Sequence, residues 1–130
     1  MKRILIVDDD PRVLQVLRAI LEGMRNGFQI VAVGSGAQAL AKAKKQAYDL
    51  VITDVRMSGM DGIELTEAIR GLGADSVVIW ITAYGCERLK AECERLNIHL
   101  CLEKPLRIDQ IRWAALDALK ANTSTEEPDE

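Results

Sequence analysis

The sequence predicts an α/β fold in which five parallel strands form one doubly wound sheet that is flanked by five helices. Two observations lead to this prediction. Short apolar runs rich in β-branched residues alternate five times with longer segments whose apolar residues recur at helical spacing. Five successive strand–helix units give a parallel sheet with helices on both faces, because parallel strands need crossover connections. The length of 130 residues suits a single domain.

The strands and helices follow from the pattern in chain order. The strands are expected at residues 3–7, 28–33, 49–54, 77–82 and 98–102. The first three helices begin at the N-caps Asp10, Ser35 and Asp61, and Ser35 and Asp61 are each followed three residues later by Gln or Glu, as in a capping box. The last two helices are expected at residues 87–96 and 107–120, and the first three are expected to end near residues 26–27, 47 and 71–73.

The fourth helix and the end of the chain carry further expectations. Cys86 and Cys93 lie on the apolar stripe of the fourth helix with Leu89 and Leu96, so both thiols are interpreted as small buried hydrophobes. The domain is expected to occupy residues 1–121. Residues 122–130 have no large apolar side chain and hold four carboxylates without a lysine or arginine, which predicts a disordered acidic tail.

Composition and charge exclude several classes of function. The chain has 17 basic and 20 acidic residues, for a net charge of −3, so it lacks the basic excess of a nucleic-acid-binding protein. No apolar run approaches the ~20 residues of a membrane span, and the N-terminus has no apolar region of a signal peptide. The three cysteines are odd in number and not spaced as a metal site, which favours a reduced, cytoplasmic protein.

Polar side chains stand where the predicted strands end. Asp8 and Asp9 follow the first strand, Asp54 and Thr82 end the third and fourth, and Lys104 follows the fifth. In such sheets ligands bind beyond the carboxyl ends of the strands. Clustered carboxylates repel one another, and Mg²⁺ would neutralise them because it prefers carboxylates, waters and phosphate oxygens. A carboxylate beside a cation, a hydroxyl and an ammonium can also attack phosphorus.

Four motifs at these strand ends resemble those of the receiver domains of bacterial two-component response regulators. The motifs are Ile4–Asp9 (ILIVDD), Thr53–Gly62 (TDVRMSGMDG), Ile81–Gly85 (ITAYG) and Lys104-Pro105. They occur in the family's order, each after its own strand, and the resemblance covers about residues 2 to 120. It implies a flavodoxin-like sheet with strand order 2-1-3-4-5.

The resemblance also implies a chemistry for the strand ends. Asp54 would be the phosphoacceptor, receiving a phosphoryl group from the phosphohistidine of a histidine kinase or a histidine phosphotransfer domain. Asp9 would bind Mg²⁺ directly, with Asp8 helping directly or through water. Asp54 and the backbone carbonyl of Arg56 would complete the protein ligands.

A second group of residues would turn phosphorylation into a signal. Thr82 would bond a phosphoryl oxygen, and Lys104 would pair with Asp54 and then with the phosphoryl group. Pro105 would follow a cis peptide bond. Cys101 stands at the switch position, where receivers usually carry Tyr or Phe, and a thiol has neither the bulk nor the ring of those side chains.

The resemblance therefore implies a phosphorylation-dependent switch rather than an enzyme with turnover. Its output surface would be the fourth helix, the fifth strand and the fifth helix, facing an output domain or a partner protein, and phosphorylation-dependent homodimerisation is compatible with it. Trp113, Cys101 and Glu103 are the expected reporters of the switch. Arg56 and Tyr84 are placed to tune the access of water to the acyl phosphate.

Two other classes of function remain open from the sequence. Asp8-Asp9-Asp10 contains the Asp-x-Asp pattern of Mg²⁺-dependent phosphohydrolases of the haloacid-dehalogenase type, although no acidic pair follows Lys104. A binding module that works without phosphorylation is the other. The sequence is also compatible both with a stand-alone receiver and with a receiver cut from a longer protein.

Overall fold

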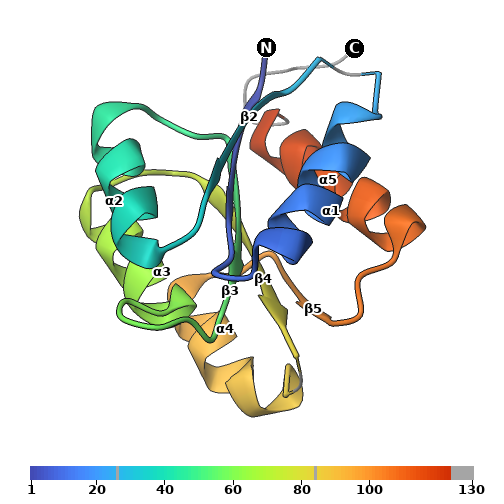
Figure 1. Cartoon of the computed structure of the whole chain (residues 1–130). Coiled ribbons are helices and arrows are strands. Elements are labelled where there is room, and N and C mark those ends of the chain that lie inside the picture. The colour runs from blue at the N-terminus through green and yellow to red at the C-terminus, as the bar shows by residue number, and fades with distance from the viewer. Residues whose placement is uncertain (26, 84, 124–130) are drawn as a thin grey trace.

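The computed structural model describes residues 1–25, 27–83 and 85–123 and contains five strands, five α-helices and one short 3₁₀ helix (Figure 1). The elements in order are β1 (Arg3–Val7), α1 (Pro11–Glu22), β2 (Gln29–Val33), α2 (Gly36–Lys45), β3 (Leu50–Asp54), α3 (Gly62–Gly71), β4 (Val77–Thr82), η1 (Glu87–Leu89), α4 (Lys90–Leu96), β5 (Leu100–Glu103) and α5 (Ile108–Thr123). All neighbouring strands are parallel and their order is β2-β1-β3-β4-β5, which confirms the predicted fold.

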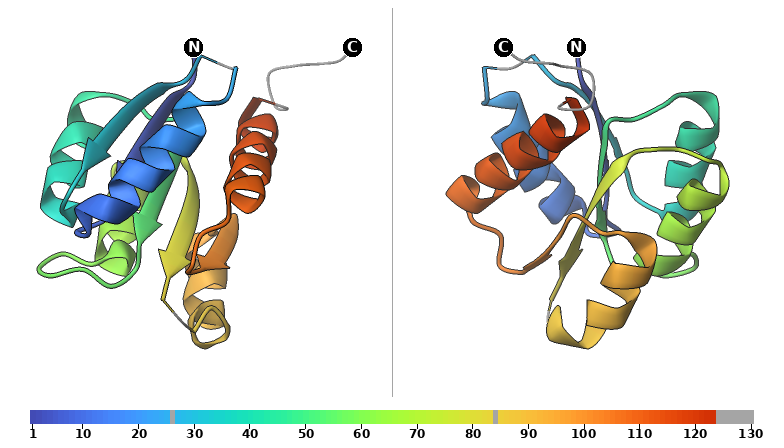
Figure 2. Two further views of the ribbon diagram at one scale, coloured as in Figure 1. Left: turned by 45° about the vertical axis from the view of Figure 1, so that its right-hand side comes forward. Right: turned by 180° about the vertical axis from the view of Figure 1, so that it is seen from behind.

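The sheet separates two apolar cores. α1 and α5 cover one face, and α2, α3 and α4 cover the other (Figures 1 and 2). Alternate residues along each strand serve opposite faces, so Ile4 and Ile6 pack under α1 and α5, whereas Leu5 and Val7 pack under α2 and α3. Because both faces are buried, the strands are apolar throughout rather than alternating.

The two helix starts with a predicted capping box both form side-chain caps, with one difference. At α3, Asp61 accepts from the Glu64 backbone N–H and Glu64 accepts from the Asp61 backbone N–H, which is a complete capping box. At α2, Ser35 accepts from the Gln38 N–H, but the Gln38 side chain accepts from the Gly34 N–H instead of from its own N-cap residue. In both cases the two side chains satisfy two backbone donors at the helix start.

The first helix is shorter than its apolar stripe predicts. The Asp10 side chain caps α1 as expected, accepting from the backbone N–H two residues further on. The helix ends at Glu22 with Gly23 as its C-cap, whereas the sequence predicted an end at residues 26–27. Gly27 does have a left-handed φ of 67°, so it turns the chain toward β2 after the helix has already ended.

The fourth helix corrects the interpretation of the cysteines. Gly85 has a φ of 93°, η1 follows, and regular α-helix starts at Lys90. Cys86 therefore precedes the helix, and it forms a disulfide with Cys101 of β5. The prediction of a buried, reduced Cys86 is wrong, because the turn at Gly85 moves this residue off the helical stripe. Cys93 is half-buried against the core under α2, α3 and α4 and is not in a disulfide.

The start of β5 and the end of α5 are also shifted from their predicted positions. β5 starts two residues later than expected because the Ile98 N–H donates to the Cys93 carbonyl and thereby caps α4. His99 is half-buried, and its Nε2 lies 2.7 Å from Asp117 Oδ2 of α5. α5 continues to Thr123, three residues past its predicted end. Most of the predicted acidic tail, residues 124–130, lies outside the described residues.

Arg70 ties three segments together at the amino-terminal edge of the sheet. Its guanidinium donates to the carbonyls of Ser76 (2.7 Å), Leu96 (3.1 Å) and Asn97 (3.2 Å). Asn97 adopts a left-handed φ of 56° and ends α4. One side chain thus holds the end of α3, the start of β4 and the end of α4.

Candidate functional site

Three carboxylates meet at the carboxyl edge of the sheet. Asp8 follows β1 and Asp54 ends β3, and these adjacent parallel strands place both side chains at one edge. Asp8 and Asp54 are buried, whereas Asp9 is exposed. One oxygen from each of the three lies within 4.8 Å of the others. Thr82, which ends β4, is buried at the same edge.

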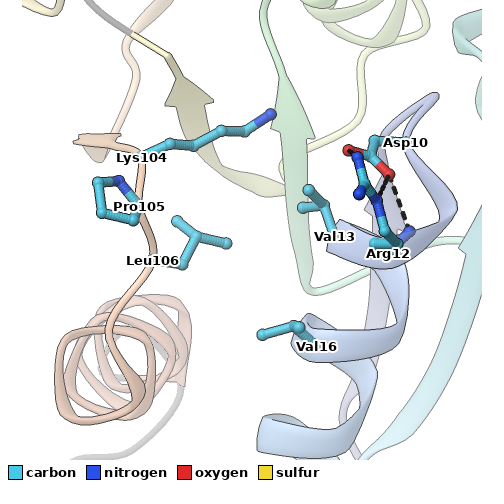
Figure 3. Close-up of a pocket in the computed structure, with 7 residues that line it drawn as sticks. All are labelled: Asp10, Arg12, Val13, Val16, Lys104, Pro105 and Leu106. Atoms are coloured by element: carbon cyan, nitrogen blue, oxygen red, sulfur yellow. Dashed lines mark hydrogen bonds and ion pairs between the residues drawn. The ribbon is translucent and has the colours of Figure 1, made fainter.

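Lys104 supplies a positive charge to this cluster. Its backbone N–H donates to the Thr82 carbonyl (2.8 Å), which fixes the residue just beyond the last pair of β4 and β5. Its side chain extends toward the end of β3 (Figure 3). The ammonium nitrogen lies 3.2 Å from Asp8 Oδ2 and 3.3 Å from Asp54 Oδ1. The Lys104-Pro105 bond that follows is cis, as the resemblance implied.

The electrostatics of the cluster favour a proton or a cation. Burial and the charges of Asp8 and Asp9 raise the pKa of Asp54 to about 6, although Lys104 acts in the opposite direction. Burial acts to lower the pKa of Lys104, but the carboxylates of Asp54 and Asp8 outweigh it and raise that pKa. The lysine is therefore charged at neutral pH, and Asp54 loses its proton only above about pH 6.

The oxygens that face the cluster fit a hard divalent cation. Asp8 Oδ1 accepts from the Asp10 N–H at 2.9 Å. Asp8 Oδ2 is buried, and the Lys104 ammonium lies 3.2 Å from it. Asp9 Oδ2 accepts from the Ser58 N–H at 3.3 Å. Three converging carboxylates, one of which has a buried oxygen, are a donor set that suits Mg²⁺.

The backbone under the site is closely packed at Gly62. Its N–H donates to the Val55 carbonyl (2.8 Å), and a Cβ at this position would overlap the Asp54 carbonyl oxygen and lie 2.9 Å from the Val55 Cα. Gly62 therefore lets α3 start directly beneath the strand end that carries Asp54. No signal in the motif pointed to this steric role.

Replacing Gly62 by alanine should destabilise the fold by about 1–3 kcal/mol, because the new methyl group can be accommodated only by moving the backbone of Asp54 and Val55. Gly71, at the other end of the same helix, serves as the control, because a methyl group added there would enter open space. Gly71→Ala should be neutral or slightly stabilising. Urea unfolding of both variants measures the effect, and equal midpoints would contradict it.

A cavity of about 390 Å³ opens next to the site, between the start of α1 and the segment after β5. Its lining is Asp10, Arg12, Val13, Val16, Lys104, Pro105 and Leu106 (Figure 3). Asp10 and Arg12 pair at its upper rim, and the remaining wall is mostly apolar. Lys104 belongs both to this cavity and to the carboxylate cluster.

Most of the chain matches the model of one protein family. The family model of the response regulator receiver domain matches residues 4–116. The chain belongs to this family. A receiver domain is a phosphorylation-dependent signalling switch rather than an enzyme, so the phosphohydrolase alternative is not favoured.

Similar proteins agree with this assignment. Transcriptional regulatory protein ZraR of Escherichia coli K12 is 37% identical over 120 residues, which are 92% of this chain and 26% of that protein. Sensor histidine kinase RcsC of the same strain is 37% identical over 109 residues, which are 84% of this chain and 11% of that protein. The receiver thus spans about a quarter or less of these relatives.

Two solved structures show the same fold. A CheY-like response regulator receiver domain protein from Methanospirillum hungatei JF-1 superposes with a TM-score of 0.88 at 25% identity, covering 96% of this chain and 98% of that one. Chemotaxis protein CheY4 of Vibrio cholerae gives a TM-score of 0.84 at 26% identity, with 92% and 99% covered.

The receiver brings together most of the residues that the sequence singled out. Its carboxyl edge gathers the three aspartates with Thr82 and Lys104. Arg56 is an exposed residue of the loop between β3 and α3. Cys101 lies on β5 three residues before Lys104. It is paired with Trp80 of β4 and forms the disulfide with Cys86. Tyr84 lies outside the described residues.

Among the described residues, no helix is both long and apolar enough to cross a lipid bilayer.

Proposed function

We propose that this receiver domain takes a phosphoryl group from phosphohistidine onto Asp54, with Mg²⁺ bound by the neighbouring carboxylates. The observation that carries the proposal is the combination of three converging carboxylates with a lysine ammonium 3.3 Å from Asp54 Oδ1. Asp8, Asp9, Asp54 and the carbonyl of Arg56 would hold the ion. When bound, the ion would neutralise charge on the carboxylates and on the transferring group.

The chain's own residues would perform the transfer as follows. The ionised Asp54 carboxylate attacks phosphorus in line as the P–N bond of phosphohistidine breaks, and the departing imidazole keeps the bond pair and takes up a proton. Lys104 stabilises the charge on the phosphoryl oxygens. The product is an acyl phosphate on Asp54, which adds negative charge and acceptor oxygens at the mouth of the site.

Thr82 and Lys104 would transmit the change. Both stand at the edge where the new phosphoryl oxygens appear, and the Lys104 N–H already bonds the Thr82 carbonyl. Movement of Thr82 toward the phosphoryl group shifts an existing equilibrium of the segment between β4 and α4. The α4–β5–α5 face would then present a changed surface to an output domain, a partner protein or a second copy. Trp113, which is 58% exposed on α5, is the natural reporter there.

Phosphorylation of the chain by acetyl phosphate tests this proposal directly. Incubation with acetyl phosphate and Mg²⁺ should add the mass of one phosphoryl group, and peptide mapping should place it on Asp54. Chelation of Mg²⁺ should suppress the labelling. Asp54→Asn is the matched control and should stay unlabelled, and a label on any other residue in the wild type would refute the assignment of Asp54.

We propose that the donor is a histidine kinase or a histidine phosphotransfer domain of the same cytoplasm. A protein that brings phosphohistidine to Asp54 must contact the rim of the site. The apolar wall of the neighbouring cavity, formed by Val13, Val16 and Leu106, is suited to packing against such a donor. The side chain of Val16 is 46% exposed, whereas Leu17, the next residue of α1, is fully buried.

Val16→Asp should slow transfer from a protein donor without affecting labelling by acetyl phosphate, because the small donor does not need the cavity wall. The histidine kinases of the same genome, autophosphorylated with radiolabelled ATP, can be mixed with the chain one at a time. The kinase that transfers within seconds is then assayed against the variant. Equal slowing with both kinds of donor would indicate damage to the site instead.

A further inference from the structure

The disulfide between Cys86 and Cys101 joins two segments that the proposed switch would have to move. Cys86 lies in the segment that leads from Thr82 to α4, and Cys101 lies on β5 three residues before Lys104. Their Cα atoms are 5.9 Å apart, well inside the range that a disulfide spans without backbone movement. The two cysteines are separated by 15 positions in the sequence, and the loop that they close contains all of η1 and α4.

A hydrogen bond reinforces the same junction. The Cys86 N–H donates to Glu103 Oε2 at 3.3 Å. β5 therefore holds Cys86 both through the disulfide bond and through a hydrogen bond to the Cys86 backbone. Further along, Leu89 and Cys93 pack against the core under α2, α3 and α4. With the bridge closed, the chain between Thr82 and α4 is tied to β5 four residues after the threonine.

Both cysteines of the bridge lie partly at the surface of the domain. Cys86 and Cys101 are each half-buried rather than enclosed in the core, and Glu87, the residue after Cys86, is exposed. Cys93 is the remaining cysteine; like Cys101, it is half-buried and packs against the core under α2, α3 and α4. Burial raises the pKa of the Cys93 thiol, so Cys93 is a weak competitor in thiol exchange.

We propose that Cys86 and Cys101 are a reversible dithiol–disulfide pair that sets how far the segment between β4 and α4 can follow Thr82. This inference rests on the proposed function. In the disulfide form, Asp54 is still phosphorylated, because the bridge lies outside the carboxylate cluster, but the response of α4 is restrained. In the dithiol form the same segment is released. The receiver would then report phosphorylation only when the pair is reduced.

The redox step needs a thiol or disulfide reagent, for which glutathione is the simplest chemical class. In the oxidising direction the two thiols pass two electrons and two protons to one molecule of glutathione disulfide. The product is the Cys86–Cys101 bond and two molecules of glutathione. The reaction proceeds by thiolate attack through a mixed disulfide, and its reverse restores both thiols.

The first measurement concerns the pair itself. The whole chain carrying Cys93→Ser is equilibrated in mixtures of reduced and oxidised glutathione, quenched in acid, alkylated and weighed by mass spectrometry. Both alkylation sites should disappear together, and a proteolytic peptide should link Cys86 to Cys101. Separate glutathione adducts on the two cysteines, with no linked peptide in any mixture, would overturn the proposal.

The second measurement concerns the restraint. Amide hydrogen exchange of residues 85–96, without any phosphodonor, should be several-fold slower in the disulfide form than in the dithiol form. A variant with Cys86→Ser and Cys101→Ser in the same background should match the dithiol form in both buffers. Equal exchange in the two redox forms would refute the restraint.

The third measurement concerns the coupling and separates it from the proposed function. Acetyl phosphate should label Asp54 to the same extent in both redox forms, while the exchange of residues 85–96 should respond to labelling only in the dithiol form. An equal response in both forms overturns the coupling. Failure to label either form would refute the proposed function and the coupling with it, and the first two measurements would still decide the bridge and its restraint.

Discussion

Asp54→Asn should raise the free energy of unfolding of the metal-free protein at pH 7 by about 1–3 kcal/mol while it abolishes phosphorylation. The wild-type carboxylate has a folded-state pKa of about 6, against 3.8 for the ordinary value, because it is buried beside Asp8 and Asp9. Ionising it in the folded state therefore costs stability, at about 1.36 kcal/mol for each unit of difference in pKa. Asparagine carries no charge at any pH and avoids this cost.

The sign of the effect fixes its dependence on pH. A raised carboxyl pKa means that the folded state binds the proton more tightly than the unfolded state. The wild type therefore loses stability as the pH rises from about 4 to about 6, and the loss is complete above that window. The advantage of Asp54→Asn should be absent at about pH 3.5 and full at about pH 7.

Urea unfolding in the presence of a chelator, at these two pH values, measures both predictions. Glu94→Gln removes an exposed carboxylate of α4 and should leave the stability nearly unchanged, which makes it the control. Replacing the chelator with Mg²⁺ should stabilise the wild type more than Asp54→Asn and so reduce the difference in their free energies of unfolding. If Asp54→Asn were less stable than the wild type at pH 7, the ionised Asp54 carboxylate would not be destabilising the folded state.

Lys104→Met should slow the labelling of Asp54 by about 10²–10³-fold and, at the same time, tighten the binding of Mg²⁺. The rate should fall because the variant lacks the charge that would stabilise the transferring phosphoryl oxygens. The affinity should rise because the ammonium, which lies 3.2 Å from Asp8 Oδ2 and 3.3 Å from Asp54 Oδ1, no longer competes with the ion. Opposite changes in rate and affinity are the signature of this arrangement.

The time course of acetyl phosphate labelling gives the rate, and calorimetric titration with Mg²⁺ gives the affinity. Lys90→Met replaces an exposed lysine of α4 and should change neither quantity. In metal-free buffer Lys104→Met should also lower the free energy of unfolding by about 1–3 kcal/mol, because two repelling carboxylates lose their partner. Unchanged Mg²⁺ affinity would show that Lys104 does not act on the carboxylates.

The order of the elements and the cluster at the strand ends could be predicted because both depend on local patterns. Apolar runs such as Ile4–Val7 identify strands, and residues at the ends of parallel strands must share an edge, so Asp8, Asp54 and Thr82 were expected to converge. Asp61 and Glu64 indicate the start of α3 in the same way. None of these predictions required knowledge of specific contacts between distant side chains.

The features that the sequence did not predict depend on backbone turns and on contacts between distant segments. Leu89, Cys93 and Leu96 continue a helical stripe back to Cys86, and nothing in that stripe shows that Gly85 would turn the chain before the helix begins. No pattern links Cys86 to Cys101 on another element. The role of Gly62 likewise arises from the approach of α3 to β3, which is a property of packing rather than of the motif.

The contacts of Arg70 give α4 a fixed pivot. At its carboxyl-terminal end, the carbonyls of Leu96 and Asn97 are held by the same guanidinium that holds Ser76, and Arg95 pairs with Glu67 of α3 one residue earlier. A displacement of the chain near Cys86, at the other end, should therefore rotate α4 about its last turn. The largest displacement would then be at the end of α4 that lies nearer the carboxyl edge of the sheet and Asp54, and the amino-terminal edge of the sheet would stay still.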